Sequence, residues 1–117
     1  EPASAECFYN RGLAYAALDR RHDALDDYTH ALALDPRLAA ASLHRGMLLR
    51  DAGRFEEAAA DFQRAIDDGA EACAVHYQWA LLHLARNDRA AAKASLRAAL
   101  AMDPDDRDSL ALLRRLE

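Results

Sequence analysis

DALDDYTHALALDP, residues 23–36, decides the fold of this chain. Its apolar residues return at helical spacing and form one stripe, made of Ala24, Leu25, Tyr28, Ala31 and Leu32. Aspartates and a histidine lie opposite that stripe. The segment ends at Asp35-Pro36, where the proline cannot continue the ladder of helical hydrogen bonds. The sequence therefore predicts an amphipathic helix that ends at residue 34.

The same pattern returns 34 residues later, and again after another 34. Small residues keep this step in three sets, which are Gly12, Gly46 and Ala80, then Ala24, Ala58 and Ala92, then Ala31, Ala65 and Ala99. Larger residues keep it in two more sets, which are Tyr28, Phe62 and Leu96, then Leu32, Ile66 and Leu100. A period of this length is typical of helical repeats, in which each unit buries its apolar face against the next.

Two breaks divide each period into two helices. Asp19, Gly53 and Asn87 share one slot, and these residue types tolerate the left-handed backbone that ends a helix. The other break falls at residues 35–36, 68–69 and 103–104. The predicted helices cover residues 5–18, 22–34, 39–52, 55–68, 73–86, 89–101 and 106–116.

The repeat resembles that of the tetratricopeptide repeat family. In the first repeat, the family's aromatic, small and proline positions hold Phe8, Gly12, Tyr15, Ala24, Tyr28 and Pro36. Arg11 and Arg45 depart from the pattern, because they take a slot that is usually leucine. The resemblance implies an all-α fold, a right-handed α-solenoid of three helix-turn-helix hairpins with a terminal solvating helix. Residues 1–117 would form one domain, with repeats at 5–38, 39–72 and 73–106 and a capping helix at 107–116.

The small residues at one slot are expected where the two helices of a repeat cross closely. A larger side chain than Gly12, Gly46 or Ala80 would overpack that contact, at a cost of roughly 1–3 kcal/mol. In HYQWALLHL, residues 76–84, the same arc holds His76, Trp79 and His83, so the tryptophan is predicted to be core. The two histidines are two turns apart, about 10 Å along the axis. No metal or cofactor site is predicted from them.

The adjacent arc of each first helix faces the concave groove of tetratricopeptide repeats, as the resemblance implies. Two rows follow it, Tyr9, Leu43 and Tyr77 beside Leu13, Met47 and Leu81, with Leu84 at one end and a fringe of Asn10, His44, Gln78 and Arg50. The second row is apolar throughout, although family members often carry a polar residue there. Because the core has its own stripe, this row is predicted to bind a partner. In the alternative, the groove is narrow, its side chains pack on one another and nothing binds.

The binding of chaperone peptides by some members of the family can be compared with this sequence position by position. Chaperone-binding members hold a peptide's terminal carboxylates with lysine, asparagine and arginine side chains. The corresponding positions here hold Tyr9, Leu13, His44, Ala74 and Gln78, none with a permanent positive charge. We therefore predict no tight binding of acidic chaperone C-terminal tails.

Composition narrows the function further. The chain is 52% hydrophobic and 30% charged, which fits a folded protein. Its net charge of −5 argues against nucleic-acid binding, and no apolar run approaches a membrane span. No nucleophile motif, phosphate loop or paired carboxylates indicate an enzyme. Acidic residues of the second helices are expected to be solvated, namely Asp23, Asp26, Asp27, Glu56, Glu57 and Asp61. Cys7 and Cys73 are expected to be reduced packing residues.

The sequence thus predicts a protein-interaction module that takes an apolar or amphipathic segment of a partner into its concave groove. The alternative is a structural role, in a homo-oligomer or in a longer repeat array. The chain begins without methionine, so it is expected to be a fragment or a processed product. The absence of a signal segment and the two unpaired cysteines suggest a cytoplasmic location.

Overall fold

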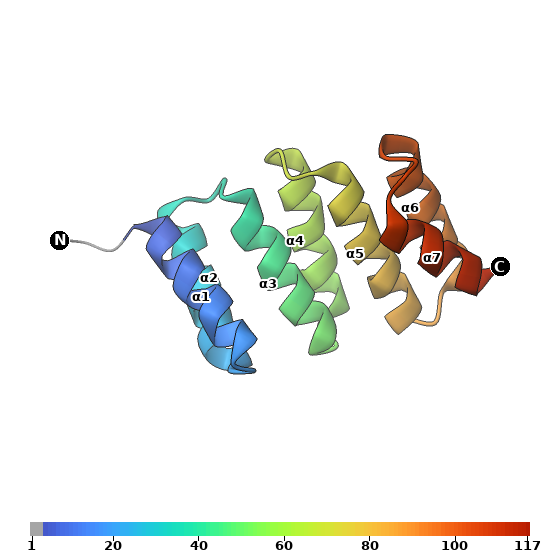
Figure 1. Cartoon of the computed structure of the whole chain (residues 1–117). Coiled ribbons are helices and arrows are strands. Elements are labelled where there is room, and N and C mark those ends of the chain that lie inside the picture. Colours follow the sequence, from blue (N-terminus) through green and yellow to red (C-terminus); the bar gives the residue numbers. More distant parts are fainter. Residues whose placement is uncertain (1–3) are drawn as a thin grey trace.

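The computed structural model describes residues 4–117, which form seven α-helices and no strand (Figure 1). The helices are α1 (Ala5–Ala17), α2 (Arg21–Leu34), α3 (Ala39–Asp51), α4 (Phe55–Asp67), α5 (Ala72–Ala85), α6 (Arg89–Met102) and α7 (Arg107–Leu116). Each begins and ends within one residue of its predicted range. The prediction of an all-α solenoid is confirmed.

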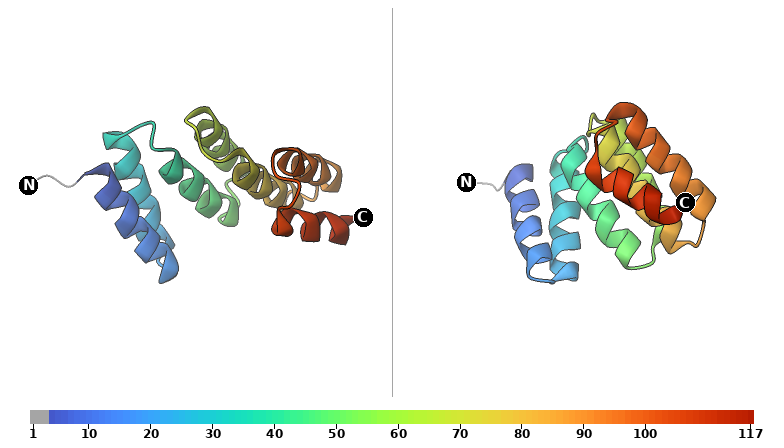
Figure 2. Two further views of the ribbon diagram at one scale, coloured as in Figure 1. Left: turned by 45° about the horizontal axis from the view of Figure 1, so that its top comes forward. Right: turned by 45° about the vertical axis from the view of Figure 1, so that its right-hand side comes forward.

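The helices form three hairpins that stack side by side, and α7 covers the last of them. The first helices of the hairpins and α7 lie at the front of Figure 1, and α2, α4 and α6 lie behind them. Figure 2 shows the same stack from two further sides. The stack measures 52 × 25 × 23 Å. An elongated stack of this kind presents a row of first helices on one face and a row of second helices on the other.

The turn inside each hairpin has the left-handed residue that the sequence predicts. The backbone angle φ is 59° at Asp19, 79° at Gly53 and 59° at Asn87. Aspartate and asparagine reach this region at modest cost, because their short polar side chains hydrogen-bond locally. One shared slot therefore fixes how all three hairpins turn.

The connection between the second and third hairpins differs from the other two. After α4, Gly69 is left-handed (φ 95°), and the N–H of Ala70 donates to the carbonyl of Ala65 at 2.8 Å. After α2 and α6, Asp35 and Asp103 are extended instead, and each accepts a hydrogen bond from the backbone N–H two residues on. The glycine thus replaces the Asp-Pro signal of the other repeats with a different helix ending.

The close crossing inside each hairpin is confirmed for the two glycines. A Cβ atom on Gly12 would lie 2.6 Å from Cε1 of Tyr28, and one on Gly46 would lie 2.7 Å from Cε1 of Phe62. Both aromatic rings are essentially fully buried. In the third hairpin the partner position holds Leu96, and the crossing residue is Ala80. The size of the crossing residue therefore matches the size of the side chain opposite it.

Ser42 occupies the slot that holds Phe8 in the first repeat. Its side chain is fully buried, and its hydroxyl oxygen has no hydrogen-bond partner. A buried hydroxyl without a partner destabilises the folded state. We expect Ser42→Ala to raise the free energy of unfolding by about 1 kcal/mol, part of it from alanine's helix propensity. Urea unfolding followed by circular dichroism measures this change.

Ser95→Ala provides the control for that prediction. Ser95 lies in the middle of α6 and is only partly buried, so its replacement changes helix propensity without removing a fully buried hydroxyl. Ser42→Ala should raise the free energy of unfolding more than Ser95→Ala does. A loss of stability on replacing Ser42 would show that its hydroxyl is satisfied in solution.

Candidate functional site

The eleven predicted groove residues lie on α1, α3 and α5. Ten of them are partly buried, and Asn10 is exposed. The most exposed large apolar side chains lie outside this set, at Leu18, Leu34 and Met102. The groove side chains are therefore accessible only in part, and their role in binding stays a prediction.

The expected separation between a core stripe and a groove stripe is only partly right. Leu43 and Met47 pack against the core cluster around Phe62. The apolar groove residues of α5, which are Tyr77, Leu81 and Leu84, pack against a second cluster that includes Leu112 of α7. The capping helix thus contributes to the cluster against which these half-buried side chains pack.

A contact between Tyr9 and His44 joins the first and second repeats across the concave face. The Tyr9 hydroxyl lies 3.3 Å from Nδ1 of His44, and the two rings meet edge to face with centroids 5.6 Å apart. Nδ1 of His44 also lies 2.9 Å from the carbonyl oxygen of Ala40. Burial raises the pKa of Tyr9 above its ordinary value. These two predicted groove residues therefore contact each other, and their binding of a ligand stays a prediction.

A second contact joins the second and third repeats. Nη1 of Arg50 donates to Oε1 of Gln78 at 2.5 Å, and Nε donates to the carboxylate of Asp51 at 3.2 Å. The Arg50 side chain is only 11% exposed. The charge that was expected to be available to a partner is therefore already bound within the chain.

Two hollows are lined in part by predicted groove residues. The first, between α3 and α5, has a volume of about 630 Å³ and is lined by Arg50, Asp51, Gly53, Phe55, Leu81, Leu84 and Ala85. The second, between α5 and α7, has a volume of about 210 Å³ and is lined by Glu71, Cys73, Ala74, Tyr77, Gln78, Asp106 and Asp108. The structure thus gathers five predicted residues, Arg50, Tyr77, Gln78, Leu81 and Leu84, at two openings.

Sequence reasoning missed the residues that α7 and its preceding turn bring to the groove. Asp108 stands 34 positions after Ala74, in the same slot of the period, and this spacing is the signal that could have found it. Hydrogen bonds with Ser109 lower the pKa of Asp106, so this carboxylate is ionised at neutral pH. The negative end of the groove agrees with the prediction against acidic tails, which itself stays untested.

The structure corrects the interpretation of the acidic residues on the second helices. Asp27 and Asp61 are each 2% exposed, not solvated. Arg11 donates to both oxygens of Asp27 at 2.7 and 2.8 Å, and Arg45 donates to both oxygens of Asp61 at 2.8 Å. Such bidentate pairs are among the stronger charge-assisted contacts. The arginines that depart from the family's leucine position therefore have a structural role.

The third repeat replaces this ion pair with Trp79 and Ser95. An open hollow of about 440 Å³ lies at this place, and it is lined by Gln63, Ile66, His76, Trp79, His83 and Ser95. The Trp79 ring packs 6.0 Å from that of Phe62, as a core residue would, but it is also partly exposed in this hollow. The prediction that Trp79 is core is only partly right.

The two cysteines have different surroundings. Cys73 is buried, as predicted, but Cys7 is exposed, so its prediction as a packing residue is wrong. Cys7 takes the slot of Ala41 and Val75, which are buried against a preceding helix; within residues 4–117 no helix precedes α1.

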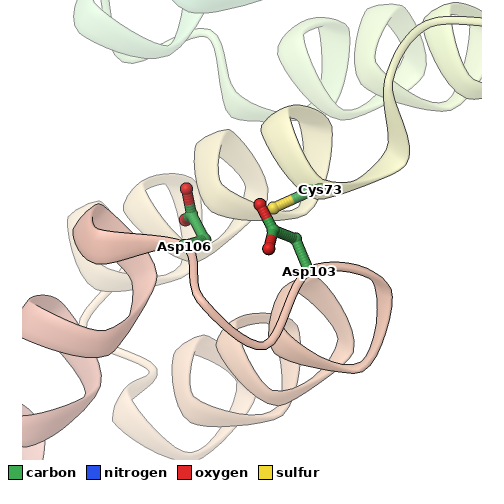
Figure 3. A group of neighbouring side chains, drawn as sticks. All are labelled: Cys73, Asp103 and Asp106. Carbon is green, nitrogen blue, oxygen red and sulfur yellow. The ribbon is translucent and has the colours of Figure 1, made fainter.

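The Cys73 thiol lies beside two carboxylates, and the three side chains point toward one another (Figure 3). Its sulfur and one oxygen from each of Asp103 and Asp106 lie within 4.8 Å of one another. Burial, followed by the charges of Asp106 and Asp103, raises the pKa of Cys73. These are the side chains that could hold a metal ion. A separation of 30 residues between Cys73 and Asp103 gave the sequence analysis no local motif to recognise.

Within residues 4–117 no helix has the combination of length and apolar character that crossing a bilayer requires.

Stacked hairpins with a concave row of first helices define a helical repeat protein. Profiles of the tetratricopeptide repeat match residues 5–38, 39–67 and 77–114. The chain belongs to the tetratricopeptide repeat family.

Solved structures share the fold at low sequence identity. The first TPR of Spaghetti (RPAP3), bound to the HSP90 peptide SRMEEVD, is 18% identical with a TM-score of 0.87, over 97% of this chain and 90% of that one. YrrB, described as a TPR protein with an unusual peptide-binding site, is 21% identical with a TM-score of 0.88, over 97% of this chain and 58% of that one. At these identities the likeness concerns the fold alone.

Curated relatives match over about half of this chain. A probable UDP-N-acetylglucosamine--peptide N-acetylglucosaminyltransferase SPINDLY from Hordeum vulgare is 36% identical over 54% of the chain and 7% of its own length. The corresponding transferase of Giardia intestinalis is 38% identical over 56% of the chain and 4% of its length. DnaJ homolog subfamily C member 3 of Mus musculus is 33% identical over 56% of the chain and 13% of its length. The matches cover a small part of each relative, so their activities as whole proteins do not transfer to this chain.

Proposed function

We propose that this chain is a protein-interaction module that binds an apolar or amphipathic segment of a partner protein in its concave groove. The observation that carries the proposal is the hollow of about 630 Å³ between α3 and α5. Leu81, Leu84 and Phe55 line it, and none of them is fully buried. An open concave hollow with apolar walls can take a partner's apolar side chain.

We place the partner along α5, because both hollows are lined by residues of this helix. The Tyr9–His44 contact lies elsewhere, between the first two repeats. Apolar side chains of the partner would occupy the α3–α5 hollow, and its polar groups would meet Gln78 and Asp51. Peptide binding by proteins of the same fold, such as the one bound to an HSP90 peptide, supports this proposal.

A displayed-peptide selection on the purified chain tests the proposal. Peptides with a pair of apolar residues should be enriched, with micromolar affinity, because few anchors offset the cost of ordering a flexible peptide. The Leu81→Gln, Leu84→Gln double variant should weaken the binding of such a peptide at least about tenfold, since each buried apolar side chain contributes 1 kcal/mol or more. Fluorescence anisotropy of the labelled peptide measures the affinity.

The matched control is Leu18→Gln, Leu34→Gln, which removes two leucines that are 69% and 57% exposed and lie outside the groove. Circular dichroism establishes that both variants are folded. Equal affinity for the two variants, or no enriched peptide, would argue against the groove. A molecular mass that rises with concentration in sedimentation would then favour self-association, the structural alternative.

A further inference from the structure

Three metal-ligating side chains converge at the turn between α6 and α7. Cys73 comes from the first turn of α5, and Asp103 and Asp106 flank the turn that leads into α7. The sulfur and the two carboxylate oxygens lie within 4.8 Å of one another (Figure 3). Cys73 is only 5% exposed, and its thiol points at the carboxylates. A buried sulfur aimed at two oxygen ligands is a donor set of the kind that holds a transition metal.

Within residues 4–117, neither carboxylate has a positively charged partner. The ion pairs found between residues 4 and 117 involve other aspartates and glutamates, and none includes Asp103 or Asp106. Each carboxylate uses one oxygen locally: Oδ1 of Asp103 accepts from the N–H of Asp105, and Oδ2 of Asp106 accepts from the N–H of Ser109. The other oxygen of each carboxylate takes no part in these two hydrogen bonds.

We infer that Cys73, Asp103 and Asp106 bind a divalent transition-metal ion, and that zinc is the ion the donor set fits best. A thiolate disfavours magnesium and calcium, and two carboxylates disfavour the soft cuprous ion. The thiol proton is released to solvent as the sulfur–metal bond forms. Water fills the fourth position from the α5–α7 hollow, which Cys73 and Asp106 both line.

The geometry needs only a small adjustment to close around the ion. Zinc–sulfur and zinc–oxygen bonds of about 2.3 and 2.0 Å place tetrahedral ligands about 3.5 Å apart. The three ligand atoms already lie within 4.8 Å of one another, so side-chain rotations of at most roughly an ångström suffice. Cys73 is buried in the packing of α5, whereas Asp103 is exposed and, among the described residues, has only its hydrogen bond from the N–H of Asp105 to hold it.

Metal binding would fasten the capping helix to the third repeat. It would tie the start of α5 to the turn before α7, next to the groove residues Tyr77 and Gln78. It would also neutralise part of the negative charge at this end of the groove. The inference rests on the Cys73 cluster alone and does not depend on the proposed binding of a partner.

Titration of the reduced, intact chain with Co²⁺ tests the inference. A thiolate-to-cobalt charge-transfer band should appear, saturate at one ion per chain and disappear when Zn²⁺ is added. Cys73→Ser should abolish the band. Asp103→Asn and Asp106→Asn should each weaken binding at least about tenfold, the loss that even an outer-shell partner causes. Zn²⁺ should raise the Tm of the parent chain and leave that of Cys73→Ser unchanged.

The matched variants separate this site from incidental binding. Asparagine keeps the acceptor oxygen that each aspartate uses locally, so the turn and the N-cap of α7 are retained. Asp105→Asn removes a carboxylate of the same turn that lies outside the cluster, and Cys7→Ser removes the exposed thiol; both should bind Co²⁺ like the parent chain. The absence of a band would overturn the inference. A band that depends on Cys7, or equal binding by Asp103→Asn and Asp105→Asn, would mean an adventitious ion only and would overturn it as well.

Discussion

Replacing Arg45 by leucine is expected to lower the free energy of unfolding by about 3 kcal/mol. The Asp61 side chain is 3% exposed and receives two hydrogen bonds from Arg45, whose own side chain is 19% exposed. Leucine, the usual residue of the family at this slot, removes both bonds and leaves the carboxylate buried. Arg64, at 3.4 Å, compensates only in part. Urea unfolding of the two proteins measures the difference.

The third repeat suggests how this loss can be reversed. Its corresponding residues, Trp79 and Ser95, carry no charge, and the repeat folds without the ion pair. We therefore expect the Arg45→Leu, Asp61→Ser double variant to recover about 2 kcal/mol of the loss, because no unpaired charge stays buried. Asp61→Ser completes the double-mutant cycle. If the two single changes add up to the double change, the pair contributes nothing beyond the separate residues.

An exposed pair provides the comparison for Arg45. Arg54 and Glu57 also form two hydrogen bonds, but both side chains are more than half exposed. Arg54→Leu should leave the unfolding midpoint unchanged within error, since water replaces the lost contact. A large fall in the midpoint for Arg54→Leu would show that losing any ion pair destabilises the chain, whether or not the pair is buried.

The helix boundaries could be read from the sequence because local chemistry sets them. Left-handed residues at Asp19, Gly53 and Asn87 end one helix of each hairpin whatever the tertiary contacts are. The period of 34 then places every helix relative to its neighbours. Seven helices predicted to within one residue, in the part of the chain that the structure describes, follow from these two features.

The buried ion pairs could not be read from hydrophobicity, because that analysis assigns every charged residue to the surface. Their signal was a repeated separation: Arg11 and Asp27 are 16 residues apart, and so are Arg45 and Asp61. A charged residue that recurs with the repeat, in a slot that is otherwise apolar, should have a buried partner of opposite charge.

The predicted groove was limited by the capping helix. The angle between residues on one helix places Tyr77, Leu81 and Leu84 on the concave arc. It does not show that Leu112 of α7 packs beside them or that Asp106 and Asp108 make one end acidic. How a terminal helix lies across its neighbour depends on tertiary packing, which a single-helix pattern does not contain.

The second large effect concerns the close crossing inside the second hairpin. Gly46→Ala is expected to lower the free energy of unfolding by about 2 kcal/mol, although alanine favours helix more than glycine does. The new Cβ would lie 2.7 and 2.8 Å from two ring carbons of Phe62 and 3.1 Å from Cβ of Asp61. The ring is fully buried, so it cannot swing away into solvent. The midpoint of urea unfolding checks this result.

The third hairpin again offers the compensating change, because there Ala80 lies opposite Leu96. Phe62→Leu alone should cost about 1 kcal/mol or more through the cavity it leaves. Combined with Gly46→Ala it should cost less than the sum of the two, since the methyl group enters the space that the ring vacates. The opposite substitution, Ala80→Gly, should destabilise the chain, because it lowers helix propensity and removes no steric clash. Additive effects at positions 46 and 62 would mean that the backbone of α3 shifts to accept the methyl group. The Phe62 ring would then not be what limits the size of the residue at position 46.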